Sequence, residues 1–342
     1  MPVPRSEPPV TAPSPIAPTA LITGITGQDG SYLTEQLLSK GYQVHGLVRR
    51  QSSTKRLRLD HLYANEEIYE RQLYLHYADL NDATTMRRVL MTVKPDELYH
   101  LAGQSHVGAS FDIPESTCET TAMATLRLLE IIRDLPQRPR LLHISSSEIF
   151  GRPATAPQNE LSPRQPVTPY GVAKAFATDM VRIYRESFDF FACNAICYNH
   201  ESPRRGESFV TRKISRAVAA IERGETDHLT LGSLDAHRDW GYAPEYVEGM
   251  WKMLQHDQPG DYVLATGRSH SLRDFLEAAF AVVGRDYQDY VRTDPRFVRP
   301  AEVHALVGDP RKAEQTLDWK ARTSLAELAR IMVEHDLQHP GV

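Results

Sequence analysis

The sequence contains few cysteines, no long apolar run and no excess of positive charge. Its 342 residues include three cysteines, too few for a disulfide framework or a cysteine-based zinc site, so we expect no metal centre and a reducing, cytoplasmic location. No apolar stretch approaches the ~20 residues that a membrane-spanning helix needs. With 39 lysines and arginines against 44 aspartates and glutamates, the chain offers no broad basic surface. We therefore expect neither nucleic acid nor a membrane as a partner.

Prolines are concentrated at the start of the chain. Residues 1–18 hold many of them and lack the apolar segment of a signal peptide, which predicts a disordered leader. Apolar residues are plentiful, at 41%, and can form the core of one large domain or of two closely packed domains.

Short apolar runs alternate with amphipathic stretches through the first half of the chain. The apolar runs have the length of strands and span residues 19–25, 42–48, 73–77, 97–101, 140–144 and 190–196. The amphipathic stretches carry apolar residues at helical spacing over residues 31–40, 83–92, 116–134 and 170–187. This alternation predicts an α/β fold with a Rossmann-type, doubly wound parallel sheet. Cys193 and Cys197 fall in the apolar stretch over residues 190–197, where we expect buried thiols.

The pattern changes after Asn199. A polar loop over residues 201–207 is followed by helices that are more isolated. We therefore predict a dinucleotide-binding domain over residues 19–198 and a smaller, mostly helical substrate-binding lobe over residues 199–337. Such lobes often return a strand to the main sheet, and residues 260–266 contain a suitable apolar run.

Glycines recur at the end of the first predicted strand. Gly24, Gly27 and Gly30 lie between this strand and the next helix, which is the context of a turn that binds a dinucleotide pyrophosphate. The first allows a tight turn, the second lets the backbone approach the phosphates, and the third lets helix and strand pack closely. The alternative is a purely structural turn. The predicted cofactor-binding residues of this segment are Gly24, Thr26, Gly27, Gln28, Asp29 and Gly30.

Two arginines, Arg49 and Arg50, end the second predicted strand. An acidic residue there would accept hydrogen bonds from a free 2′-hydroxyl, whereas guanidinium groups favour a 2′-phosphate. This predicts NADP rather than NAD, unless both side chains only face solvent or a neighbouring subunit. Asp79 and Leu80 follow the third strand, where they would meet the adenine, and Leu101 follows the fourth, where the cofactor passes close to the chain.

Tyr170 and Lys174 are spaced so that both side chains lie on one face of a predicted helix. A tyrosine with an ordinary pKa of ~10 is a poor base at neutral pH, so a nearby lysine and an oxidised nicotinamide are needed to stabilise its phenolate. Ser146, at the end of the fifth strand, is placed to hydrogen-bond a substrate hydroxyl or carbonyl beside this tyrosine. Together these residues predict redox chemistry.

Glu148 lies two residues after Ser146, and in an extended segment its carboxylate would point the same way. A simple ketoreductase has no need of that carboxylate. A sugar dehydratase does, because once a carbonyl exists at C4 a base must take the acidified C5 proton. The alternative is a solvated carboxylate in a turn.

Several longer segments carry a resemblance to a known family. They are residues 20–32, 101–110, 199–213, 234–241, 299–302 and 308–310. On them the chain resembles the extended short-chain dehydrogenase/reductases and, within these, the GDP-mannose 4,6-dehydratases. The resemblance implies a lyase in which Tyr170 takes the O4 proton and NADP takes the C4 hydride. Glu148 then takes the C5 proton and helps water leave from C6, and the hydride returns to C6.

The resemblance also implies further ligands and an assembly. The resemblance implies that Tyr170 and Lys174 also bind the cofactor, and it adds Gln104, His200 and Arg205 as cofactor-binding residues. The residues implied to bind the GDP-sugar are Ser105, Asn199, Lys213, Arg238, Arg299 and Glu302. Residues 50–58 resemble an arginine-bearing loop that reaches a neighbour's cofactor, which implies a homotetramer or a homodimer. The implied pathway is deoxy-sugar synthesis for capsule or lipopolysaccharide.

Some residues depart from the family pattern. Ser146 stands where the family usually has threonine, and Gly103, Ser233, His237 and His304 also differ. These differences leave room for a related substrate such as a GDP-manno-heptose. The alternative activity on the same scaffold is a GDP-4-keto-6-deoxy-sugar reductase or epimerase, and the presence of Glu148 counts against it because those reactions need no base for elimination.

Overall fold

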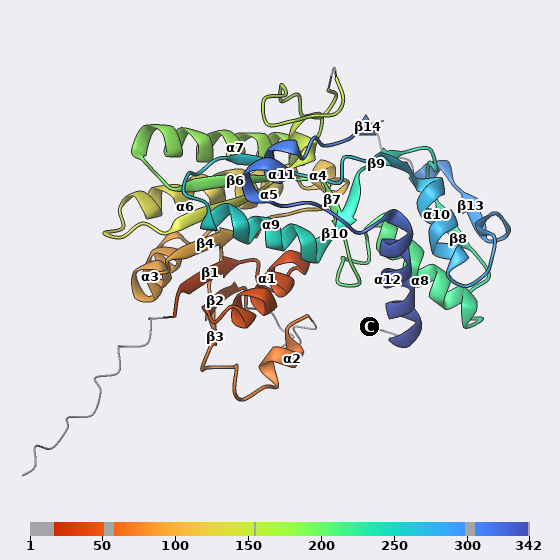
Figure 1. Cartoon of the computed structure of the whole chain (residues 1–342), viewed down its shortest axis with the longest axis horizontal. Coiled ribbons are helices and arrows are strands. Elements are labelled where there is room, and N and C mark those ends of the chain that lie inside the picture. The colour runs from red at the N-terminus through yellow and green to blue at the C-terminus, as the bar shows by residue number, and fades with distance from the viewer. Residues whose placement is uncertain (1–16, 51–57, 154, 298–304, 341–342) are drawn as a thin grey trace, which may run out of the picture.

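A seven-stranded parallel sheet forms the centre of the structure, a computed structural model that describes residues 17–50, 58–153, 155–297 and 305–340 (Figure 1). The strands are β1 (Thr19–Thr23), β2 (Gln43–Val48), β3 (Leu73–Tyr77), β4 (Glu97–His100), β5 (Arg140–Ser146), β6 (Ala192–Cys197) and β11 (Asp261–Leu264). Their order, β11-β6-β5-β4-β1-β2-β3, reverses between β1 and β4. The predicted doubly wound sheet is confirmed, and folds of this kind bind nucleotides at that reversal.

Helices cover both faces of the sheet. Those on one face are α1 (Gln28–Ser39), α9 (Ala243–Gln255) and α11 (Arg311–Leu317). Those on the other are α3 (Ala83–Val93), α6 (Ala124–Arg133) and α7 (Pro169–Phe188). Both layers bury apolar side chains against the strands, which explains why the strands appear in the sequence as continuous apolar runs. The predicted burial of Cys193 and Cys197 is confirmed.

Part of the second half of the chain forms a smaller lobe, to the right of the sheet in Figure 1. Its helices α8 (Val210–Glu222), α10 (Leu272–Ala281) and α12 (Leu325–Gln338) enclose a separate apolar core. Its short strands pair as β7 (Asn199–Glu201) with β10 (Trp240–Tyr242), β8 (Leu229–Leu231) with β13 (Val291–Thr293), and β9 (His237–Arg238) with β12 (His270–Ser271) and β14 (Ala305–Leu306). Strand β11 leaves this lobe and pairs with β6 of the main sheet.

The predicted helix over residues 116–134 is interrupted. It is divided into α5 (Pro114–Cys118), a π-helical turn (Glu119–Met123) and α6. Threonine hydroxyls along this stretch donate to carbonyls four residues back, which competes with regular helical bonding; they belong to Thr117, Thr120 and Thr125.

The remaining short elements are α2 (Asp60–Tyr63), α4 (Ala109–Asp112) and 3-10 turns at Ser147–Ile149, Tyr287–Asp289 and Pro295–Phe297. Apart from residues 17 and 18, the predicted leader lies outside the described residues. Within the described ranges, no helix combines the length and the apolar character needed to cross a membrane.

Candidate active site

The glycine turn joins β1 to α1. Gly24 has a φ of +76°, and a Cβ there would lie 2.8 Å from the backbone nitrogen of Ala102. A Cβ at Gly30 would lie 2.3 Å from the Gly24 carbonyl oxygen, so glycine lets α1 begin at Gln28, earlier than predicted. Gly27 is exposed at the helix N-terminus. The turn therefore has the open backbone and the helix dipole that suit a pyrophosphate.

Asp29 lies in the first turn of α1, where a lone carboxylate would repel a phosphate. His200, from β7, places its Nε2 2.9 Å from Asp29 Oδ2. Burial acts to raise the pKa of Asp29, but the charge and hydrogen bond of His200 outweigh burial and lower it. Burial acts to lower the pKa of His200, yet Asp29 raises it. The two side chains therefore neutralise each other beside the turn.

Arg58 and Arg204 cover the outside of this turn, and neither was predicted as a site residue. Arg58 donates to the Arg204 carbonyl at 2.7 Å and to the Thr26 carbonyl at 3.3 Å. Arg204 bonds Glu35 at 2.6 Å and lies 4.1 Å from the ring centroid of Tyr32. The run of arginines after β2 is the only sequence signal for Arg58, because its partners are distant in the chain.

The residues predicted to bind the adenosine half follow neighbouring strands. Arg49 and Arg50 are exposed directly after β2, Asp79 and Leu80 follow β3, and Leu101 follows β4. Because parallel strands end at the same edge of a sheet, these residues lie on the edge that carries the glycine turn.

Helix α7 carries Tyr170 and Lys174 beside the end of β5. Thr168 caps the helix by accepting the Gly171 N–H at 2.9 Å, and a proline occupies the first helical position. Tyr170 is 7% exposed and Lys174 4%. The Lys174 ammonium donates to the Ile144 carbonyl on β5 at 2.7 Å. The predicted catalytic pair is thus buried, and its lysine is hydrogen-bonded to the sheet.

Burial also sets the charges of this pair. It raises the pKa of Tyr170 to about 12, while a hydrogen bond with Ser146 acts to lower it and the charge of Glu148 to raise it. Burial lowers the pKa of Lys174 to about 8. The phenol is therefore neutral at physiological pH, and a positive charge brought by a bound cofactor is needed to make it a base.

The segment that carries Glu148 is not extended, and that prediction is wrong. Ser147–Ile149 form a 3-10 turn because the Ser146 hydroxyl accepts the Glu148 N–H at 3.3 Å. The Glu148 side chain is half-buried, and its charge acts on Tyr170. Ser146, Glu148 and Tyr170 therefore lie close together, with a local geometry that differs from the predicted one.

The comparison with known proteins decides the family. Residues 21–332 match the family model described as GDP-mannose 4,6 dehydratase. The chain belongs to this family. The GDP-mannose 4,6 dehydratase 2 of Caenorhabditis elegans is 48% identical over 338 residues, which cover 93% of this chain and 88% of that protein. The human GDP-mannose 4,6 dehydratase is 47% identical, with coverages of 93% and 91%, and that of Sinorhizobium fredii is 48% identical, with 94% and 97%.

Solved structures of lower identity share the fold. DesIV, the dTDP-glucose 4,6-dehydratase of Streptomyces venezuelae, solved with NAD bound, has a TM-score of 0.81 at 24% identity. The match covers 92% of this chain and 96% of DesIV. The UDP-glucose 4-epimerase of Bifidobacterium longum, in complex with NAD+ and UDP, has a TM-score of 0.80 at 22% identity, with coverages of 94% and 98%.

In this member of the GDP-mannose 4,6-dehydratase family, all the predicted sugar-nucleotide ligands except Ser105 come from the second half of the chain. Lys213 lies on α8 and donates to the Thr230 carbonyl at 2.7 Å. Arg238 lies on β9, and Asn199 is half-buried at the start of β7. Two further predicted ligands, Arg299 and Glu302, lie outside the described residues.

The loop after β4 meets the segment after β7 in this family member. Gln104 donates to the His106 carbonyl at 3.0 Å, and Ser105 is exposed. The ring centroids of His106 and Phe209 are 5.6 Å apart, and the Arg205 guanidinium lies 3.7 Å from the Phe209 centroid. Phe209 belongs to residues 199–213, which carry the family resemblance, and its position between the two loops is visible only in the structure.

Proposed function

We propose that this chain converts GDP-mannose to its GDP-4-keto-6-deoxy product and water, as a hydro-lyase that uses NADP and regenerates it in each turnover. The observation that carries the proposal is the grouping of Glu148 with Ser146 and Tyr170, in a chain of this family. A carboxylate beside the tyrosine supplies the second base that elimination of water requires.

Each step can be assigned to a side chain so that atoms balance. Tyr170 accepts the O4 proton. A nicotinamide dinucleotide held at the glycine turn would supply the hydride chemistry between C4 and C6. Glu148 accepts the C5 proton, which the C4 carbonyl has acidified, and delivers it to the departing C6 hydroxyl, which leaves as water. The proton held by Tyr170 then goes to C5. Ser146 holds O4 beside the tyrosine through these transfers.

The glycine turn fits a dinucleotide, and the arginines after β2 favour NADP over NAD. Arg49 and Arg50 are exposed at the end of β2, where the adenosine ribose lies in folds of this type. A guanidinium forms charge-assisted hydrogen bonds to a 2′-phosphate that are stronger than any it can form to a neutral 2′-hydroxyl. Titration with NADP+ and with NAD+ tests this, and equal affinities would contradict it.

Incubation of the purified protein with GDP-mannose tests the activity itself. We expect mass spectrometry to show the loss of one water without added NADPH. A parallel reaction with GDP-manno-heptose tests the related substrate, and no water loss from either sugar would reject the dehydratase proposal. A product reduced at C4, formed only with added NADPH, would instead indicate the reductase.

The Glu148→Gln variant tests the base. Glutamine keeps the shape of the side chain and cannot accept the C5 proton, so exchange of the C5 hydrogen with solvent deuterium should stop while partial oxidation at C4 survives. An unchanged turnover rate would remove Glu148 from the mechanism.

We further propose that two copies pair through α7, as a homodimer or within a homotetramer. Apolar side chains are exposed along this helix and on the neighbouring segments; they are Val172, Phe176, Ile183, Phe188, Phe111, Ile113 and Met123. Such a face is more stable when covered. Light scattering on the wild type and on Phe176→Glu tests this, and a monomeric wild type would contradict it. The arginine loop expected to contact a neighbour lies, over residues 51–57, outside the described residues.

A further inference from the structure

Polar side chains form one row across the buried sheet. Thr23, His100, His143, Asn194 and Asp261 occupy matching positions on β1, β4, β5, β6 and β11. None is more than 8% exposed. Burying a polar group inside a parallel sheet costs free energy unless it is hydrogen-bonded, so the direction of each bond in this row matters.

The amide of Asn194 sets these directions. Its Nδ2 donates to the Thr178 carbonyl at 3.0 Å and to Asp261 Oδ1 at 2.9 Å. Both partners only accept, so Asn194 Oδ1 faces His143 Nδ1 at 2.9 Å, and that nitrogen carries the proton. Burial, with the charge of Lys174 adding to it, lowers the pKa of His143 well below its usual value. His143 is therefore a neutral imidazole that donates from Nδ1.

The same amide holds the catalytic helix. Thr178 lies one helical turn after Lys174; its hydroxyl donates to the Lys174 carbonyl at 2.8 Å and lies 2.6 Å from Ser145 Oγ. The Lys174 ammonium donates to the Ile144 carbonyl at 2.7 Å. Ile144 and Ser145 directly follow His143 on β5. Strands β5 and β6 are thus hydrogen-bonded to α7 around the turn that carries Lys174.

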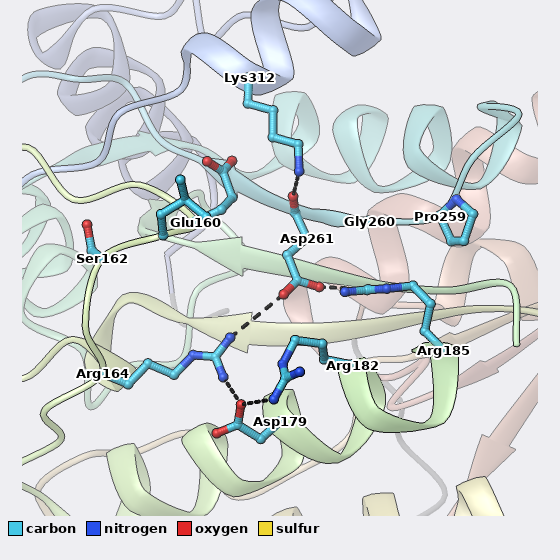
Figure 2. Close-up of a pocket in the computed structure, with 11 residues that line it drawn as sticks. Glu160, Ser162, Arg164, Asp179, Arg182, Arg185, Pro259, Gly260, Asp261 and Lys312 are labelled. Atoms are coloured by element: carbon cyan, nitrogen blue, oxygen red, sulfur yellow. Dashed lines mark hydrogen bonds and ion pairs between the residues drawn. The ribbon is translucent and has the colours of Figure 1, made fainter. Parts of the chain in front are cut away.

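The far end of the row enters a charged cluster, shown in Figure 2. Asp261 accepts from Arg185 of α7 at 2.8 Å and lies 3.7 Å from Arg164, which pairs with Asp179 of α7. Lys312 donates to the Asp261 carbonyl at 2.7 Å. Because these cations are already paired, the cluster acts as an anchor for α7 rather than as a ligand site.

We propose that His143 is a positioning residue for the catalytic helix. Its Nδ1–H fixes the orientation of the Asn194 amide, which keeps Asn194 on the Thr178 carbonyl and so keeps Lys174 and Tyr170 aligned with the substrate. The proposal rests on the proposed function, in which Tyr170 and Lys174 serve the transfers at O4 and C4. Without the donor, Asn194 Oδ1 loses its partner and the amide can turn away from α7.

Two substitutions of His143 distinguish the loss of its hydrogen-bond donor from the loss of its side-chain volume. His143→Leu removes the donor and keeps an apolar side chain of moderate size, whereas His143→Asn keeps an N–H at the position of Nδ1. We expect kcat for water loss to fall about tenfold or more in H143L, because misplacing a catalytic group by 1 Å can cost ~10²-fold. The KM for GDP-mannose should stay within about twofold, because no ligand contact is removed. We expect H143N to recover most of the wild-type kcat.

A pH profile adds a readout that a general loss of stability would not change. In H143L a displaced Lys174 stabilises the Tyr170 phenolate less, so kcat should rise with pH at a higher midpoint than in the wild type. Cys193→Ala is the matched control, because Cys193 is buried on the opposite face of β6. It should lower the melting temperature and leave both kcat and the pH midpoint unchanged.

The kcat values of the three variants decide whether His143 positions the helix. A kcat for H143L no lower than that of C193A would overturn the proposal, as would an H143N variant as slow as H143L. If H143L does not fold, nitrogen-15 NMR of the wild-type histidines decides: a neutral Nδ1–H tautomer supports the proposal, and an Nε2–H tautomer or a charged ring rejects it. Wild-type water loss is measured first, so failure of the proposed function is seen independently of His143.

Discussion

At the scale of single residues, the buried lysine of the proposed catalytic pair lowers the stability of the folded protein. Lys174 is almost fully buried, and burial lowers its pKa from 10.5 to about 8. The folded protein therefore carries an ammonium that would be more stable in water whenever the pH is below about 8. Sites that break the rules of a stable core in this way are typical of active sites.

Lys174→Met should abolish activity and make the protein more stable. Because the folded pKa is lowered, the penalty is fully present below about 8 and disappears as the pH rises through 10.5. At ~1.4 kcal/mol per pKa unit, the change from 10.5 to about 8 corresponds to at most about 3.5 kcal/mol at pH 7. Urea unfolding and kcat at pH 7 check this.

The control for this variant is Lys320→Met, at an exposed lysine whose side chain is 65% accessible. It should change neither the free energy of unfolding nor kcat. A Lys174→Met protein that is less stable than the wild type would contradict the argument, as would one that keeps its turnover.

At the scale of elements, α7 links the chemistry to the fold. Its first turn carries Tyr170, its second carries Lys174, and its later turns carry the arginine and aspartate groups that pair near β11. The helix and its Tyr-Lys face were predicted from local spacing. Its register against β5 and β6 could not be, because Asn194 and Thr178 carry no local signal for each other.

Thr168→Ala should weaken the start of α7 and slow catalysis. The Thr168 hydroxyl accepts the Gly171 N–H at 2.9 Å, and loss of such a cap costs about 1 kcal/mol. Fraying would loosen Tyr170, so kcat should fall several-fold. Ser324→Ala removes an equivalent cap from α12, away from the site, and should lower the melting temperature while kcat stays unchanged. Equal kcat losses in the two variants would contradict the prediction.

At the scale of the whole molecule, the two halves of the chain meet at the glycine turn. Gln28 accepts from the Ser202 hydroxyl at 2.8 Å and donates to the His200 carbonyl at 3.0 Å. Arg204 reaches Glu35 on α1. The cofactor turn and the segment that leads to the smaller lobe are therefore joined by buried bonds. Cofactor binding at the turn should thus stabilise both halves together.

Stability should fall when the pH is lowered from 7.5 to 5.5. Burial lowers the pKa of His100 to about 3 and that of His143 well below its usual value. Their contribution to the free energy of unfolding is complete above the unfolded pKa of ~6.5 and is lost as the pH falls below it, by about 3 kcal/mol for the two together at pH 5.5. The raised pKa of His200 acts in the opposite direction. Urea unfolding at the two pH values measures the net change in the free energy of unfolding.

The variant His100→Asn tests this prediction. Because an amide does not titrate, the free energy of unfolding should depend less on pH in this variant than in the wild type. Equal stability of the wild type at both pH values would contradict the argument.

Local patterns in the sequence determined the strands, most of the helices, the glycine turn and the Tyr-Lys face, because alternation, helical spacing and glycine act over a few neighbouring residues. Only the tertiary structure decided that Glu148 lies in a 3-10 turn, that Arg58 binds the cofactor turn, and that His200 neutralises Asp29. The last pair is separated by 171 residues. Such contacts depend on how the elements pack, and packing brings together side chains that no local pattern relates.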